Sequence, residues 1–181
     1  MDAYKAIKER RSIRRYVDKE VPEEVLKKCV NAGRLSPSGA NLQPLKFIKI
    51  NKKLEEVFEH TNWAGHLDWD PSKEEMPMAY IAILKKEDLG LDMDAGIAAQ
   101  SICITALNQG LGSCILGAID RDGLNKLLPV PDDYEIKLMV ALGYPKEEPS
   151  IVESEGGLEY FLEEGELQVP KRPLNEVMIE W

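Results

Sequence analysis

The sequence has few of the residues that build metal centres or disulfide frameworks. Its 181 residues include only three cysteines and two histidines. The cysteines, Cys29, Cys103 and Cys114, are widely spaced and form no CxxC pair, which argues against a zinc site or disulfides and favours a reduced, cytoplasmic protein. His60 and His66 lack a third ligand at a recognised spacing, so we expect no metal.

Long apolar runs and positive charge are also scarce. No run approaches the roughly 20 apolar residues that span a bilayer, and residues 1–5 lack the apolar core of a signal peptide. The chain has 23 Lys and Arg against 32 Asp and Glu, a net charge of -9. Phosphate-rich partners need a basic face, so neither nucleic acid nor membrane is expected as a partner. The length and the 44% hydrophobic share predict one soluble domain over residues 1–181.

Against this acidic background, the segment from Arg10 to Tyr16 holds four arginines and one serine in seven positions. The planar guanidinium group suits phosphate, and a serine hydroxyl adds another donor. The alternative is a solvated basic turn that complements the end of a first helix. The segment alone leaves both interpretations open.

The hydrophobic pattern predicts a mixed chain of helices and strands. Helices are expected at residues 2–9, 22–33, 52–60, 93–109 and 121–128, and strands at 45–50, 79–84 and 136–142. Asp2 can cap the first helix, and Pro22 suits the first position of the second. The helix at 93–109 is apolar nearly all round, so it must be buried in the core or in a subunit interface.

Two segments could contact a ligand, or the first could be only a helix-to-strand connection and the second only a helix stop that leads into a strand. Residues 36–44 are Ser-Pro-Ser-Gly-Ala-Asn-Leu-Gln-Pro, which expose backbone and short polar side chains. Residues 110–117 are Gly-Leu-Gly-Ser-Cys-Ile-Leu-Gly, which match neither the Rossmann nor the Walker pattern. After Glu147 acidic residues and glycines dominate, and residues 163–166 are not expected to join a core. Residues 169–181 read as an extension that lies on another surface, such as a partner subunit.

The order of these motifs resembles that of the FMN-dependent nitroreductase superfamily. The motifs are, in chain order, Arg-Arg-Ser-x-Arg, Ser-Pro-Ser-Gly-Ala-Asn, the stretch from Asp94 to Gln100, Ala-Leu-Gly-Tyr-Pro and Lys-Arg-Pro-Leu. The resemblance covers nearly the whole chain. It implies an α+β fold, a three-layer α/β/α sandwich with a mainly antiparallel central sheet. It also implies a homodimer, in which a tail from about residue 165 to 181 wraps the partner subunit.

The resemblance further assigns roles to individual positions. The residues that match phosphate contacts are Arg10, Arg11, Ser12, Lys171 and Arg172; those that match contacts to the flavin ring are Arg14, Leu116 and Gly117; and those that match a loop reaching the FMN of the other subunit are Pro37, Ser38, Gly39 and Asn41. The backbone amides of Leu116 and Gly117 would approach flavin N5 and O4. A cation such as Arg14 would stabilise the negative charge of reduced flavin near N1 and O2.

The implied activity is an oxidoreductase that takes hydride from NADH or NADPH onto FMN and reduces a small-molecule acceptor, a nitroaromatic or a quinone, by a ping-pong mechanism. Alternatives are a flavin-binding or redox-sensing module without turnover, and a specialised reaction such as flavin destruction or dehalogenation. The chain departs from relatives at Leu45, where Trp is frequent, and in its short 60–79 segment, where Asn62 alone is a candidate ring contact.

Overall fold

The computed structural model describes residues 2–63, 70–154 and 156–181, so His66 lies outside the described residues. The helices are α1 (Ala3–Glu9), α2 (Glu23–Leu35), α3 (Leu54–Phe58), α4 (Asp92–Asn108), α5 (Arg121–Leu127) and α6 (Leu174–Val177), with short 3₁₀ turns η1 (Gly39–Asn41) and η2 (Lys73–Glu75). The strands are β1 (Tyr16–Val17), β2 (Leu45–Ile50), β3 (Ala79–Lys86), β4 (Gly112–Leu116), β5 (Tyr134–Pro145), β6 (Ser150–Glu153), β7 (Phe161–Glu163) and β8 (Glu166–Lys171). Among the described helices, none has the length and apolar character needed to cross a bilayer.

The central sheet is built around β5, the longest strand. β5 pairs with β3 on one side, and β3 pairs in turn with β2. On its other side β5 pairs with β4 and then, further along, with β1. Every one of these pairings is antiparallel, which confirms the predicted sheet type.

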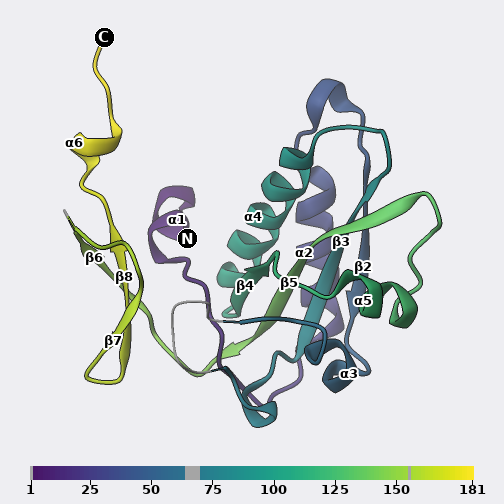
Figure 1. Ribbon diagram of the computed structural model, residues 1–181, viewed down its shortest axis with the longest axis horizontal. Coiled ribbons are helices and arrows are strands. Elements are labelled where there is room, and N and C mark those ends of the chain that lie inside the picture. Colours follow the sequence, from purple (N-terminus) through teal and green to yellow (C-terminus); the bar gives the residue numbers. More distant parts are fainter. Residues whose placement is uncertain (1, 64–69, 155) are drawn as a thin grey trace.

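The sheet separates two hydrophobic cores. Along β3, Tyr80 and Ala82 face one core while Ile81 and Ile83 face the other, as the alternation of a strand requires. α2 and α4 cover one face of the sheet, and α3 and α5 cover the opposite face (Figure 1). The three-layer α/β/α sandwich predicted from the sequence is therefore confirmed.

One helix of this sandwich keeps an apolar face in solvent. Ala95, Ala98 and Ile102 of α4 are buried against the sheet and α2, as the apolar sequence predicts. On the opposite side of the helix, Met93 is 63% exposed and Ile97 is 39% exposed. The chain therefore buries one side of α4 and leaves apolar side chains on the other side exposed.

The acidic C-terminal region forms a second sheet that the sequence analysis missed. β6 pairs parallel with β8, and β7 pairs antiparallel with β8. Glu164 and Gly165 take positive φ angles in the turn between β7 and β8, so the residues expected to stay out of the core form an exposed hairpin turn. Leu167 just beyond it is buried. The chain after Lys171 runs away from the body to the C-terminus (Figure 1).

Candidate functional site

The arginine segment lies on two paired glycines of the central sheet. Ile13 packs so closely on Gly112 that a Cβ there would be 2.7 Å from the Ile13 Cγ1. Tyr16 packs in the same way on Gly143, and Gly112 and Gly143 are register partners in β4 and β5. The Ile13 N–H donates to the Ser113 carbonyl at 2.9 Å, and the Tyr16 hydroxyl donates to the Ile13 carbonyl at 2.5 Å. These glycines therefore give the arginine segment a flat backbone support.

A side chain added at one of these glycines should disturb the packing of the arginine segment on the sheet. In Gly143→Ala the new Cβ would lie 2.7 Å from Cδ1 of the fully buried Tyr16, which has no space to move into. We expect the free energy of unfolding to fall by about 1–3 kcal/mol, as overpacked cores do. Urea denaturation measures it. Gly110→Ala is a poor control because Gly110 has a φ of +76°, whereas Gly96→Ala meets no atom within 4 Å and, inside the helix α4, should raise stability by up to about 1 kcal/mol.

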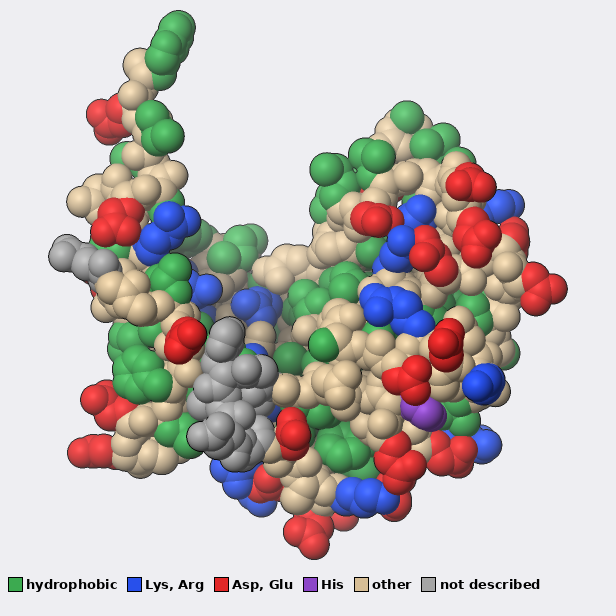
Figure 2. Space-filling model, in the orientation of Figure 1, with side chains coloured by type: hydrophobic (Ala, Val, Ile, Leu, Met, Phe, Trp, Pro, Cys, Tyr) green, Lys and Arg blue, Asp and Glu red, His purple; other side chains and the backbone are tan. Residues whose placement is uncertain are grey.

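The segment supplies most of the cations of one cavity. This cavity has a volume of about 380 Å³ and lies between the main body and the C-terminal sheet. Its lining is Ile7, Arg10, Arg11, Ser12, Arg14, Gln100, Ile151, Tyr160, Val169 and Lys171. Among the described residues it has four cationic side chains and no carboxylate, in a chain of net charge -9. Figure 2 shows Lys and Arg side chains at the base of the hollow beside the C-terminal sheet.

These cations are not neutralised within the described part of the chain. None of the ion pairs found there involves Arg10, Arg11, Arg14 or Lys171. The Arg11 Nε is buried without a hydrogen-bond partner, and burial, together with the nearby Arg10, lowers the pKa of Arg11. A bound anion would accept a hydrogen bond from the unsatisfied Nε and would stabilise the charged form of Arg11 against burial and the repulsion of Arg10, because buried charge is stabilised by pairing.

Arg14 is held by groups from two other segments. Its guanidinium carbon lies 4.7 Å from the centre of the Tyr160 ring, a cation–π distance. Its backbone N–H donates to the Glu147 carboxylate at 2.5 Å, and the N–H of Arg15 donates to the same oxygen at 3.3 Å. The carboxylate of Glu147 therefore fixes the backbone while the Arg14 side chain stays on the cavity.

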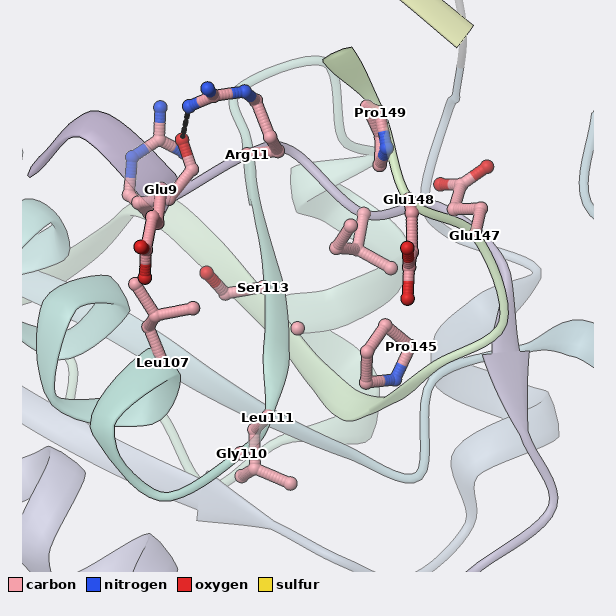
Figure 3. A pocket seen from close by; sticks show the side chains of 13 residues that line it. Glu9, Arg11, Leu107, Gly110, Leu111, Ser113, Pro145, Glu147, Glu148 and Pro149 are labelled. Atoms are coloured by element: carbon pink, nitrogen blue, oxygen red, sulfur yellow. Dashed lines mark hydrogen bonds between the residues drawn. The ribbon is translucent and has the colours of Figure 1, made fainter. Parts of the chain in front are cut away.

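A second cavity of about 330 Å³ shares Arg10 and Arg11 but has a different chemistry. In Figure 3 the Glu9 and Glu148 carboxylates lie across it from each other, and Arg11 extends along its upper edge and donates to the Arg10 carbonyl at 2.7 Å. Its lining includes three carboxylates, those of Glu9, Glu147 and Glu148, against two arginines. An anion is therefore favoured in the first cavity, where Ser12, Arg14 and Lys171 take the place of the glutamates.

Arg15, whose role the sequence left open, faces away from both cavities. Its guanidinium donates to both carboxylate oxygens of Glu75, at 2.6 and 3.0 Å, and Lys146 donates to Glu75 at 2.9 Å. These bonds, that of Arg15 above all, lower the pKa of Glu75 to about 2, although its partial burial opposes this. Arg15 therefore ties the arginine segment to η2.

This ion pair should make stability depend on acid pH. The folded pKa of Glu75 lies below its ordinary value of 4.5, so its contribution is present above about pH 5 and is lost as pH falls toward 2. Because Arg15 is partly exposed, we expect Glu75→Gln to cost about 1 kcal/mol at pH 7 and almost nothing near pH 2. Urea denaturation across this pH range measures the difference. An equal loss at both pH values would contradict the assignment, and exposed Glu74→Gln is the matched control.

The other predicted site residues lie in separate places. Pro37 and Ser38 line a cavity of about 120 Å³ that shares no residue with the arginine cavity. Gly39 and Asn41 belong to the same loop, at η1. Leu116 and Gly117 stand at the far end of β4, where Gly117 is exposed. Arg172 is exposed and does not line the cavity that Lys171 reaches. Within one chain, Lys171 therefore lies at the same cavity as the arginine segment, whereas the 37–41 loop lies elsewhere.

The sequence analysis missed Tyr160 and Gln100 as cavity residues. Tyr160 sits in a region whose composition gave no sign of structure, and Gln100 looked like one polar residue on an apolar helix. Asn62, the weak candidate, is brought near Gly117, since its N–H donates to the Ala118 carbonyl at 3.1 Å. The neighbouring His60 is engaged elsewhere, with its Nδ1 2.9 Å from Asp120 Oδ2.

Among the described residues, none of the cysteines is an activated nucleophile. All three cysteines are free and buried. Burial raises the pKa of Cys29 to about 12 and that of Cys114 to about 11, so both thiols stay protonated at neutral pH. Within the described residues no group of three or more His, Cys, Asp or Glu could hold a metal ion. What the site can do chemically is bind an anion.

Comparison with known proteins gives a consistent result. A family model described as the nitroreductase family matches residues 7–82 and 79–144. A Methanothermobacter thermautotrophicus protein, provisionally named NADH dehydrogenase/NAD(P)H nitroreductase, is 34% identical over 161 residues, covering 82% of this chain and 80% of its own. Iodotyrosine deiodinase of Nematostella vectensis is 28% identical over 204 residues, covering 97% of this chain and 74% of its own.

A solved structure supports the same assignment. The crystal structure of a provisionally named nitroreductase in complex with FMN, from Desulfovibrio desulfuricans, superposes with a TM-score of 0.75 at 25% identity. The match covers 100% of this chain and 98% of that one. From the shared fold, the family model and the relative at 34% identity, the chain belongs to the nitroreductase family.

Proposed function

We propose that this protein is an FMN-dependent oxidoreductase that uses NADH or NADPH to reduce a small-molecule acceptor such as a nitroaromatic or a quinone. The observation that carries the proposal is the cavity in which Arg10, Arg11, Arg14 and Lys171 converge, with no carboxylate among the described residues that line it. FMN ends in a phosphate, and a cluster of unpaired guanidinium groups is suited to bind it. The FMN complex of the Desulfovibrio desulfuricans relative supports the choice of ligand.

Different residues of the cavity would contact different parts of the cofactor. Arg10, Arg11, Ser12 and Lys171 would hold the phosphate, and Arg14 would contact the flavin ring. When bound, the flavin supplies the hydride chemistry, in two half-reactions that use the same pocket. Arg14 offers a positive charge that favours the anionic reduced form and so raises the reduction potential. The β4 end at Leu116 and Gly117 would place backbone amides near the ring.

We also propose that the active form is a homodimer. The 37–41 loop and the arginine cavity are separate within one chain, as expected if the loop serves the cofactor of the partner subunit. Met93 and Ile97 leave an apolar face on α4, and apolar residues of the C-terminal segment are exposed. In this chain β8 pairs with β6 and β7 of its own subunit, so the wrapping segment would be residues 172–181.

A visible spectrum followed by anaerobic titration tests the proposal. Purified protein reconstituted with FMN should be yellow, and NADH or NADPH should bleach the flavin before an acceptor restores its colour. A protein that stays colourless after reconstitution would refute FMN binding. A flavoprotein that neither NADH nor NADPH reduces would instead support the flavin-binding or redox-sensing alternative.

Reductive dehalogenation is a second candidate. Its support is the match to iodotyrosine deiodinase, which covers 97% of this chain. The two candidates differ in their acceptor, so reduced protein should be offered a quinone, a nitroaromatic and an iodinated phenol in parallel. Release of iodide faster than reduction of the other two acceptors would favour dehalogenation.

A further inference from the structure

We propose that Asp94 is a positioning residue, which holds the loop of residues 37–43 in the shape needed to complete the FMN site of the partner subunit. The inference rests on the proposed function and adds a residue to it. Asp94 is 1% exposed, and its carboxylate is bonded to two backbone segments. Its Oδ1 accepts the Gly39 N–H at 3.1 Å, and its Oδ2 accepts the Leu91 N–H at 3.2 Å.

The loop needs such support because its backbone is unusual. Ala40, Asn41 and Gln43 all have positive φ angles, of 48°, 56° and 49°. This region is unfavourable for residues with a side chain, and it persists only where the surroundings impose it. All three of these residues are exposed, so packing on their side chains does not impose it. The constraint comes instead from hydrogen bonds within the loop, such as that from the Gln43 N–H to the Ser38 hydroxyl at 3.0 Å, and from the contacts that hold the base of the loop.

Several contacts connect that base to the main body, among them the bond from the Lys86 N–H to the Pro44 carbonyl at 2.9 Å, and the bond to Asp94 is the charged one. At one end the Ser36 hydroxyl donates to the Ser101 hydroxyl of α4 at 2.7 Å. At the other end Pro44 packs on Gly90, where a Cβ would be 2.4 Å from the Pro44 Cγ. Between them lies the Gly39–Asp94 bond. The loop is therefore fixed at its base, and its tip projects into solvent.

Replacing Asp94 by asparagine keeps the size of the side chain but removes one acceptor. An amide offers one oxygen, so its NH₂ group would face one of the two backbone N–H donors. We expect the Asp94→Asn dimer to bind FMN about tenfold more weakly and to show an altered circular dichroism of the bound flavin. Asp92→Asn is the matched control. It makes the same charge change in the same helical turn, but Asp92 is exposed and pairs with Lys137 at 3.0 Å.

A heterodimer separates action on the partner from action on the same subunit. Asp94→Asn and Arg10→Ala chains are coexpressed with different tags, purified as a mixed dimer and titrated with FMN. If Asp94 shapes the loop that serves the partner's site, one site combines an intact cavity with an intact loop. The mixed dimer should then bind one FMN with wild-type affinity. A mixed dimer of Arg10→Ala and Arg14→Ala should have no such site.

Each outcome decides the matter. If wild-type protein binds FMN and the Asp94→Asn dimer binds it equally well, or the mixed dimer lacks a wild-type site, the role of Asp94 is wrong. If wild-type protein binds no FMN, the proposed function itself fails. Should the Asp94→Asn chain not fold, a Ser101→Ala chain takes its place in the mixed dimer. That substitution removes the Ser36–Ser101 hydrogen bond, which also holds the loop. Restoration of one wild-type site supports the positioning of the loop, and its absence refutes it.

Discussion

Replacing Arg10 by alanine is expected to weaken FMN binding about 10- to 100-fold while leaving riboflavin binding nearly unchanged. A hydrogen bond to a charged group contributes about 1.5–3 kcal/mol, and riboflavin lacks the phosphate. The backbone bonds of Arg10 survive the substitution, since its N–H donates to the Ala6 carbonyl at 2.9 Å and its carbonyl accepts from Arg11. Fluorescence titration of both flavins gives the two dissociation constants.

Two neighbouring arginines serve as controls for this result. Arg14→Ala should weaken FMN and riboflavin together, because Arg14 is assigned to the ring that both flavins contain. Arg15→Ala should lower stability through loss of its bond to Glu75, yet leave the ratio of the two dissociation constants unchanged. If Arg10→Ala weakened both flavins by the same factor, its assignment to the phosphate would be wrong.

Removal of residues 174–181 is expected to raise the dissociation constant of the dimer by at least about 100-fold. The removed segment carries five large apolar side chains that are at least half exposed in the single chain, Leu174, Val177, Met178, Ile179 and Trp181. Burying one such side chain contributes about 1.5–3 kcal/mol, and a factor of ten needs 1.4 kcal/mol. Two of them buried against a partner would account for the change. Analytical ultracentrifugation over a range of concentrations measures it.

The truncated chain should keep its own fold. The backbone hydrogen bonds of the segment are local, from Glu176 N–H to Pro173 and from Met178 N–H to Leu174. Far-ultraviolet circular dichroism should therefore show the secondary structure of the wild-type protein. Glu176→Gln alters the same segment without removing apolar surface, and it should leave the association unchanged. A truncated protein that sediments as wild type would show that another surface carries the dimer.

The sequence predicted most of the fold because its periodicities were strong. The apolar run at residues 79–84 is buried, and the apolar helix at residues 93–109 is buried on the side that packs on the sheet and α2, while Met93 and Ile97 stay exposed. The C-terminal sheet escaped prediction because its strands are short and lie among exposed acidic residues. Leu167 and Pro170 are buried where β8 pairs with β7 and β6, contacts between segments that composition does not reveal.

The candidate site was predictable only in part, for a related reason. The arginines drew attention because four of them stand together in an acidic chain. Tyr160 and Gln100 reach the same cavity from distant segments, and no local pattern marks them. Of the two glycines under the segment, Gly112 belongs to a stretch that the sequence marked as a possible ligand contact, and Gly143 stood only within the Ala-Leu-Gly-Tyr-Pro motif. The structure shows that their lack of a side chain admits Ile13 and Tyr16 instead.

That pair of glycines also sets when the cofactor site can form during folding. Ile13 contacts Gly112, and Tyr16 contacts Gly143, so each contact closes a chain segment of about a hundred residues or more, which is entropically slow. The support exists only after β4 has paired with β5. We therefore expect refolding chains to gain helical circular dichroism before they can quench FMN fluorescence. Flavin binding would then report the last long-range step of folding.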